Sequence, residues 1–145
     1  MLYRMVTLSS ARIRIEGSIV SGTLGGVLAA RMERLSALEL TGALVWEEGY
    51  FMEVLEGLPQ PLGEFWEQLR QDPHHSDLKR LELRPVRRRE YATWALGRAR
   101  QDAGPSALVR KLQTIAPRAD EVRTHVRDII SGGVMAETGL VSETV

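Results

Sequence analysis

Residues 40–57, LTGALVWEEGYFMEVLEG, are the segment that most limits what this chain can fold into. Two mostly apolar, β-prone runs flank Glu47-Glu48-Gly49, and a glycine in so short a connection favours a tight hairpin turn. The segment therefore predicts two antiparallel strands, the second of which ends at Gly57. One residue is at odds with a buried strand: Glu53 places a carboxylate in the middle of the apolar run.

The residues on either side of this hairpin predict the remaining elements of one compact sheet. Apolar residues at helical spacing predict a helix that begins near Ser21 or Thr23, and another over 62–69 that stops before Asp72-Pro73. Alternating and β-prone stretches predict three more strands, over residues 2–8, 77–86 and 90–99. The order β-α-β-β-α-β plus a fifth strand predicts an α+β, ferredoxin-like fold, with an antiparallel or mixed sheet and two helices on one face.

The pattern changes after Gly104, where two amphipathic helices are predicted over residues 106–117 and 119–131. We expect them to cap the sheet, and we expect the Gly- and Thr-bearing end of the chain to be a flexible tail. The predicted organisation is thus a ferredoxin-like domain over residues 1–100, a helical cap over 101–132 and a tail over 133–145.

Composition excludes several classes of function. Nineteen basic and nineteen acidic residues cancel, which argues against nucleic acid and anionic membranes as partners. Cysteine is absent, which removes disulfides, thiolate metal sites and cysteine nucleophiles. The chain has no apolar run long enough to span a membrane and no signal-peptide pattern, so we expect a cytoplasmic protein.

The hairpin, the following helix and the stretch DPHHSDLKRLELRPVRRREYATWALG at residues 72–97 together resemble a BLUF domain. The resemblance extends from about Leu2 to Arg98, about two thirds of the chain. It implies a bacterial blue-light sensor in signal transduction, with a flavin, usually FAD, held between the two helices of a ferredoxin-like fold.

Three positions on which the photochemistry of that family depends carry other residues here. The family's tyrosine in a Tyr-x-Ser element corresponds to Thr7, its asparagine on the first helix to Leu35, and its switching glutamine to Glu53. Threonine cannot serve as the redox partner of an excited flavin, and leucine has no donor or acceptor for the ring's polar edge. An ionised Glu53 can only accept hydrogen bonds and would repel the ring's oxygens.

Other positions of the family's flavin pocket keep suitable residues. The resemblance places Asp72, His75, Trp94 and Arg34 near the flavin, although these positions are less specific than the three that differ. It therefore implies FAD as the cofactor, and the changed positions predict that FAD is absent or weakly bound here.

Each of these residues also has a purely structural interpretation. Glu53 could pair with one of the many arginines, Leu35 could belong to the core, and the tryptophans could be packing residues. The adjacent histidines His74 and His75 do not form a convincing metal site, because no third ligand set is evident. The run Arg87–Arg89 is more typical of a solvated face than of a phosphate site.

The favoured hypothesis is a regulatory BLUF-like module without working photochemistry, acting through protein contacts with an unidentified partner or as a homo-oligomer. The alternative is an FAD-binding photoreceptor with altered switch residues. An enzyme on the ferredoxin-like fold, for example an acylphosphatase-type hydrolase, is not expected, because no phosphate-cradling loop is found in the sequence. If the flavin is lost, Leu35 should pack toward the sheet, and Glu53 should bond to the Thr7 hydroxyl or pair with an arginine.

Overall fold

The computed structural model describes residues 1–11, 22–99, 104–132 and 134–137. Its sheet has the strand order β4-β1-β3-β2-β5-β6, in which the first four strands follow the order of a ferredoxin-like fold. The strands are β1 (Leu2–Ala11), β2 (Thr41–Glu47), β3 (Tyr50–Gly57), β4 (His75–Val86), β5 (Trp94–Arg98) and β6 (Val134–Glu137). All neighbours are antiparallel except β2 and β5, so the sheet is mixed, as predicted.

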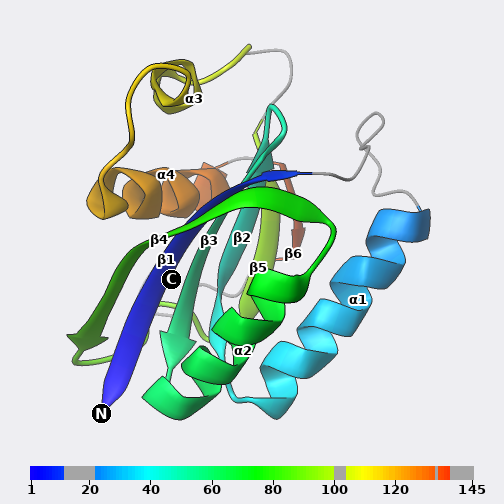
Figure 1. The fold of residues 1–145 in the computed structure, drawn as a ribbon, viewed down its shortest axis with the longest axis vertical. Coiled ribbons are helices and arrows are strands. Elements are labelled where there is room, and N and C mark those ends of the chain that lie inside the picture. The colour runs from blue at the N-terminus through cyan, green and yellow to red at the C-terminus, as the bar shows by residue number, and fades with distance from the viewer. Residues whose placement is uncertain (12–21, 100–103, 133, 138–145) are drawn as a thin grey trace.

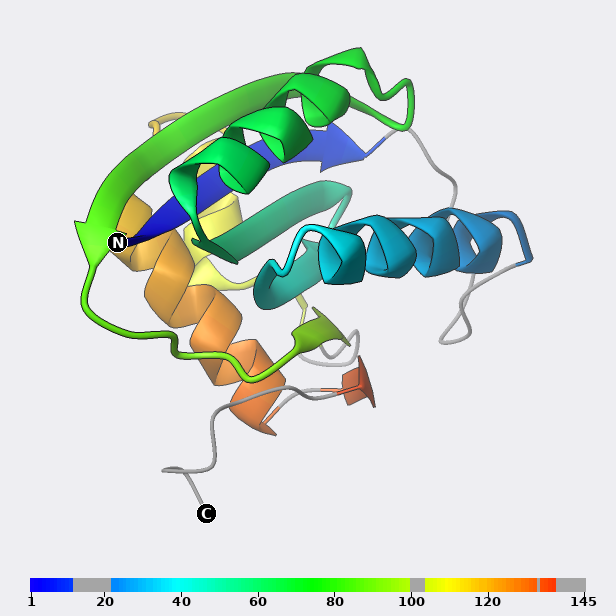
Figure 2. The same ribbon diagram turned by 90° about the horizontal axis from the view of Figure 1, so that it is seen from below.

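Helices cover both faces of this sheet (Figures 1 and 2). The first pair, α1 (Gly22–Ala37) and α2 (Pro59–Gln71), lies on one face. The second pair, α3 (Ala107–Leu112) and α4 (Ala119–Gly132), lies on the other. The predicted two helices on one face and C-terminal cap on the other are therefore confirmed, although α3 ends well before the predicted residue 117.

Alternation along the strands assigns each side chain to one of two cores. On β1, Met5 packs with the α1 and α2 side chains, whereas Val6 and Leu8 pack with α4. The alternation predicted for residues 2–8 is confirmed, and the strand continues to Ala11. Two separate hydrophobic cores thus lie on opposite faces of the sheet, and both are shielded from solvent.

The β2–β3 hairpin has the turn that its sequence predicts. Glu48 and Gly49 both have positive φ, 49° and 82°, which is typical of the two-residue turns that fit the twist of antiparallel strands. Glu47 pairs with Tyr50 across this turn, and the pairing continues to Thr41 and Glu56. This register fixes which residues of β3 face α1 and α2.

One strand was not predicted from the sequence. Within the segment expected to be a flexible tail, Val134–Glu137 forms β6 and pairs antiparallel with β5. The remaining tail residues, 133 and 138–145, lie outside the described residues.

Candidate functional site

Glu53 lies in the middle of the sheet, on the face covered by α1 and α2. It is paired in register with Thr7 of β1 and with Leu44 of β2, and its neighbours on the same face of β3 are Phe51 and Leu55. Only 2% of its surface is exposed. A carboxylate buried to this degree needs a compensating charge and hydrogen-bond donors.

Both oxygens of the Glu53 carboxylate have a donor. Arg31 on α1 donates from Nη2 to Oε1 in a buried ion pair, and the indole Nε1 of Trp94 on β5 donates to Oε2 at 3.1 Å. The Arg31 guanidinium, 7% exposed, also lies over the ring of Phe65 on α2, 5.2 Å from its centroid. A single ionic cluster therefore joins α1, β3 and β5 and contacts α2.

The arginine pairing expected for Glu53 is confirmed, but the partner itself was not predicted. Arg31 occupies the buried stripe of α1 between Leu28 and Leu35, where helical spacing would otherwise place an apolar residue. A basic residue on the core face of a helix, opposite an acid in a buried strand, is the signal that could have identified the pair.

The other two altered positions lie on the same side of the sheet. Leu35 is fully buried, with 0% exposed, and belongs to the hydrophobic cluster that also contains Leu44 and Trp94. Thr7 is buried on β1, directly opposite Glu53. The expectation that Leu35 packs into the core on this face agrees with its complete burial.

Asp72 and His75 lie at the junction of α2 and β4. Asp72 Oδ1 accepts hydrogen bonds from the backbone N–H of His74, at 2.9 Å, and from its Nδ1, at 2.6 Å. Burial would raise the pKa of Asp72, but these bonds outweigh it, and its pKa lies below the usual range.

His75 begins β4 and is 9% exposed. Burial lowers the pKa of His75; nearby Asp72 opposes the shift, and the Arg31 charge adds to it, so the ring is neutral at pH 7. A hydrogen bond to the Leu69 backbone also opposes the shift, so at most one ring nitrogen of His75 is satisfied within the described residues, and Nε of Arg31 has no partner there.

Arg34, the remaining predicted position, is exposed in the last turn of α1, away from this buried cluster. The structure thus brings together Thr7, Glu53 and Trp94, with Leu35 in the same core and His75 near Arg31. In the described part of the chain there is no group of acidic and histidine residues that could hold a metal ion. None of its helices is long and apolar enough to cross a membrane.

The residues present do not fit the polar edge of a flavin at two positions. Leu35 has no donor or acceptor, and both oxygens of Glu53 are already bonded to Arg31 and Trp94. Near Glu53, unpartnered nitrogens of His75 and Arg31 are buried atoms that a polar ligand would satisfy.

Comparison with known proteins identifies similar sequences and folds. Residues 2–97 match the family model described as BLUF, sensors of blue light using FAD. The beta subunit of a photoactivated adenylate cyclase from Euglena longa is 30% identical over 80 residues, which cover 54% of this chain and 9% of that protein. The matched stretch is therefore less than a tenth of the cyclase subunit.

Solved structures agree in fold at low sequence identity. The BlsA ground state has a TM-score of 0.74 at 13% identity, covering 97% of this chain and 95% of that one. The dark state of BlrB, a BLUF protein, has a TM-score of 0.70 at 18% identity, covering 90% and 97%. These similarities concern the fold alone.

Proposed function

The chain belongs to the BLUF family of blue-light sensors that use FAD, and we propose that it is a regulatory module of this family that acts through protein contacts without a working flavin photocycle. The matched region is a sensor domain and not a catalytic one.

The buried pair of Arg31 and Glu53 is the observation that carries the proposal. Glu53 stands where the family resemblance puts an amide that changes its hydrogen bonds, and a carboxylate cannot donate as an amide does. Its two oxygens are also held by a cation from α1 and an indole from β5. Reorienting this side chain would break a buried ion pair, which costs about 3–5 kcal/mol when one partner is lost.

Thr7 and Leu35 support the same conclusion. Thr7 lies beside Glu53 in the sheet, where the resemblance puts the tyrosine that exchanges an electron and a proton with the flavin. Leu35 is completely buried, so a flavin edge against it would lose hydrogen bonds at a cost of about 1–3 kcal/mol per unpaired group.

One observation favours the alternative, an FAD-binding photoreceptor with altered switch residues. His75 is buried with at least one ring nitrogen unpartnered among the described residues, and Nε of Arg31 is buried there without a partner as well. Buried polar atoms without partners are rare, and a bound polar ligand would satisfy them.

The absorption spectrum of the purified protein, with and without added FAD, separates these two functions. The proposal predicts no flavin bands retained after removal of excess FAD and no spectral change under blue light. Retained flavin whose bands shift reversibly to the red on illumination would refute it and establish the alternative.

A designed variant makes a negative spectrum interpretable. We expect the combined substitution T7Y, L35N and E53Q, with R31A to remove the unpaired cation, to gain FAD binding relative to the wild-type chain. The matched control carries R31A and E53Q alone and should stay colourless, because Leu35 would still face the polar edge of the ring. A folded but colourless combined variant would show that the loss of flavin has another cause.

The protein contacts are proposed for a partner protein or a second copy of the chain, and not for nucleic acid or membrane. Net charge supports this choice, since nineteen basic and nineteen acidic residues cancel. Light scattering coupled to gel filtration measures whether the chain associates with itself, and whether light alters that association.

A further inference from the structure

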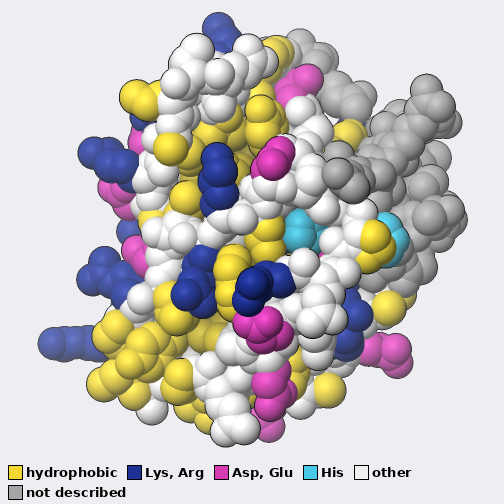
Figure 3. All heavy atoms as spheres, in the orientation of Figure 1, with side chains coloured by type: hydrophobic (Ala, Val, Ile, Leu, Met, Phe, Trp, Pro, Cys, Tyr) yellow, Lys and Arg dark blue, Asp and Glu magenta, His cyan; other side chains and the backbone are white. Residues whose placement is uncertain are grey.

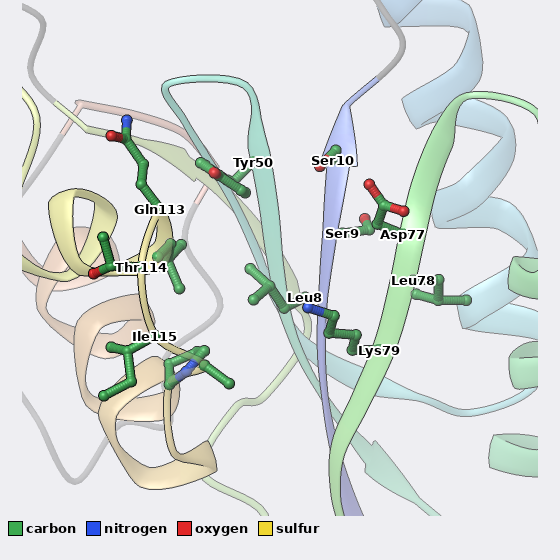
Figure 4. A pocket seen from close by; sticks show the side chains of 13 residues that line it. Leu8, Ser9, Ser10, Tyr50, Asp77, Leu78, Lys79, Gln113, Thr114 and Ile115 are labelled. Carbon is green, nitrogen blue, oxygen red and sulfur yellow. The ribbon is translucent and has the colours of Figure 1, made fainter.

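A groove of about 500 Å³ lies on the face opposite the candidate site. It separates residues 113–117, which connect α3 to α4, from the adjoining ends of β1, β3 and β4 (Figure 4). A smaller hollow of about 310 Å³ continues from it beneath α3 and shares Ser10, Tyr50 and Gln113 with it. The space-filling view shows hydrophobic side chains deep between α3 and β4, with basic and acidic side chains at the edge (Figure 3).

An irregularity in the sheet accounts for this groove. The β1–β4 register shifts between Leu8 and Ser10, so that two residues of β4 lie opposite one residue of β1. Asp77, in the bulged stretch, has a positive φ of 52°, which is uncommon for a residue other than glycine and is mildly strained. Bulges bend a strand and redirect its side chains, and they are common beside binding sites.

Hydrogen bonds hold the opposite wall in place at both ends. At the start of α3, the N–H and hydroxyl of Ser106 donate to Glu47 at 2.8 and 3.1 Å. After the connection, the backbone N–H of Arg118 donates to Glu121 at 2.9 Å, and Lys111 pairs with the same carboxylate. The groove is therefore preformed, so a ligand would not have to order the connection on binding.

Charged and apolar groups are separated across the groove. Asp77 and Lys79 stand two positions apart on β4, both exposed, and within the described residues the side chain of neither takes part in an ion pair or hydrogen bond. Across from them Ile115 is 56% exposed, and Leu8 forms the apolar floor (Figure 4). One wall thus carries an acid and a base, and the other an unburied hydrophobic side chain.

We propose that this groove binds an extended segment of a partner protein with the pattern basic–apolar–acidic, or its reverse. In an extended chain, residues i and i+2 point to one side and residue i+1 to the other. Two oppositely charged side chains would then reach Asp77 and Lys79, while the apolar one between them covers Ile115. This inference rests on the proposed function through protein contacts, and it names the chemistry of the partner.

Two synthetic peptides test it on the full chain, acetyl-Gly-Lys-Leu-Glu-Gly-amide and acetyl-Gly-Glu-Leu-Lys-Gly-amide, titrated into ¹⁵N-labelled protein by NMR. We expect one order of charges to bind more tightly, with shifts at residues around the groove. The double substitution D77K/K79D should invert the preference between the peptides, with a change in affinity ratio of about tenfold, since each exposed ion pair contributes up to about fivefold.

The apolar contact has its own variant and control. I115S should lower the affinity for both peptides about threefold to tenfold. L83S, at an exposed leucine of β4 outside the groove, should leave both affinities unchanged. Unshifted amide spectra away from the groove establish that each variant is folded. The proposal is overturned if the ratio of the two peptide affinities is the same in D77K/K79D as in the wild-type chain, or if neither peptide binds. The FAD spectrum is a separate measurement, so a chain that is colourless and binds neither peptide refutes the groove and leaves the proposed function standing.

Discussion

Replacing Arg31 by methionine is the sharpest perturbation of the candidate site. The substitution keeps most of the length and apolar volume of the side chain but removes the charge that faces Glu53. It leaves a carboxylate that is 2% exposed with only the neutral indole of Trp94 as a donor. Contact between the guanidinium and the Phe65 ring is lost as well.

The expected loss follows from the burial of the pair. Removing one partner of a buried ion pair costs about 3–5 kcal/mol, because the other charge remains in a poorly solvated position. For a domain of this size the loss corresponds to a fall in melting temperature of about 10–15 °C. Urea unfolding followed by tryptophan fluorescence gives the free energy of unfolding directly.

Two further variants make the result specific. R31M/E53Q removes both charges and keeps an amide oxygen for Trp94, so it should recover most of the lost stability. R70M makes the same substitution in the exposed pair with Glu67 and should cost less than about 1 kcal/mol. A cost for R31M no larger than that for R70M, or no recovery in the double variant, would refute the account of Glu53.

Three other variants test neighbouring features by the same unfolding assay. Burial would raise the pKa of Glu47, but hydrogen bonds from His125 and Ser106 keep this pKa below its usual range. The ionised carboxylate therefore stabilises the fold at neutral pH, and this stabilisation is lost as the pH falls through the lowered pKa. E47Q should therefore cost about 2 kcal/mol at pH 7 and flatten the loss of stability on acidification; an unchanged pH profile would contradict this. Y91F should be neutral or gain about 1 kcal/mol, because the buried Tyr91 hydroxyl has no partner among the described residues; a large loss would reveal one. G42A should cost more than about 3 kcal/mol, because its Cβ would lie 1.8 Å from the Val54 carbonyl oxygen; a stable G42A would exclude this backbone arrangement.

The fold could be predicted because its local signals agree with one another. The hairpin turn at Glu48-Gly49, the prolines at the start of α2 and the alternation along β1 each point to the same ferredoxin-like order. Strand β6 could not be predicted, because its backbone pairing with β5 depends on the position in the fold at which α4 ends. The shortening of α3 could not be predicted either, since the helix ends at Leu112 and the buried Pro117 lies well beyond that end.

The candidate site could be predicted only in part. Family resemblance located Glu53, Thr7 and Trp94, which the structure places on one face. The resemblance did not identify Arg31, because Arg31 matches none of the family positions that it covers. The two charges meet only through the packing of α1 against β3. Arg34, one turn further along α1, is exposed, and its place near a flavin stays a prediction from the resemblance.

The β2–β3 hairpin explains how the fold can persist while the site changes. It contains three buried glutamates, and a different part of the chain satisfies each of them. Glu47 is bonded to α3 and α4, and Glu56 accepts from the backbone N–H groups of Glu90 and Tyr91 at 2.8 and 3.1 Å. Both face α4, whereas Glu53 alone faces α1 and α2. Because the two faces have separate cores, the pairing of Glu53 with Arg31 can replace other chemistry on one face without disturbing the contacts that hold the C-terminal helices on the other.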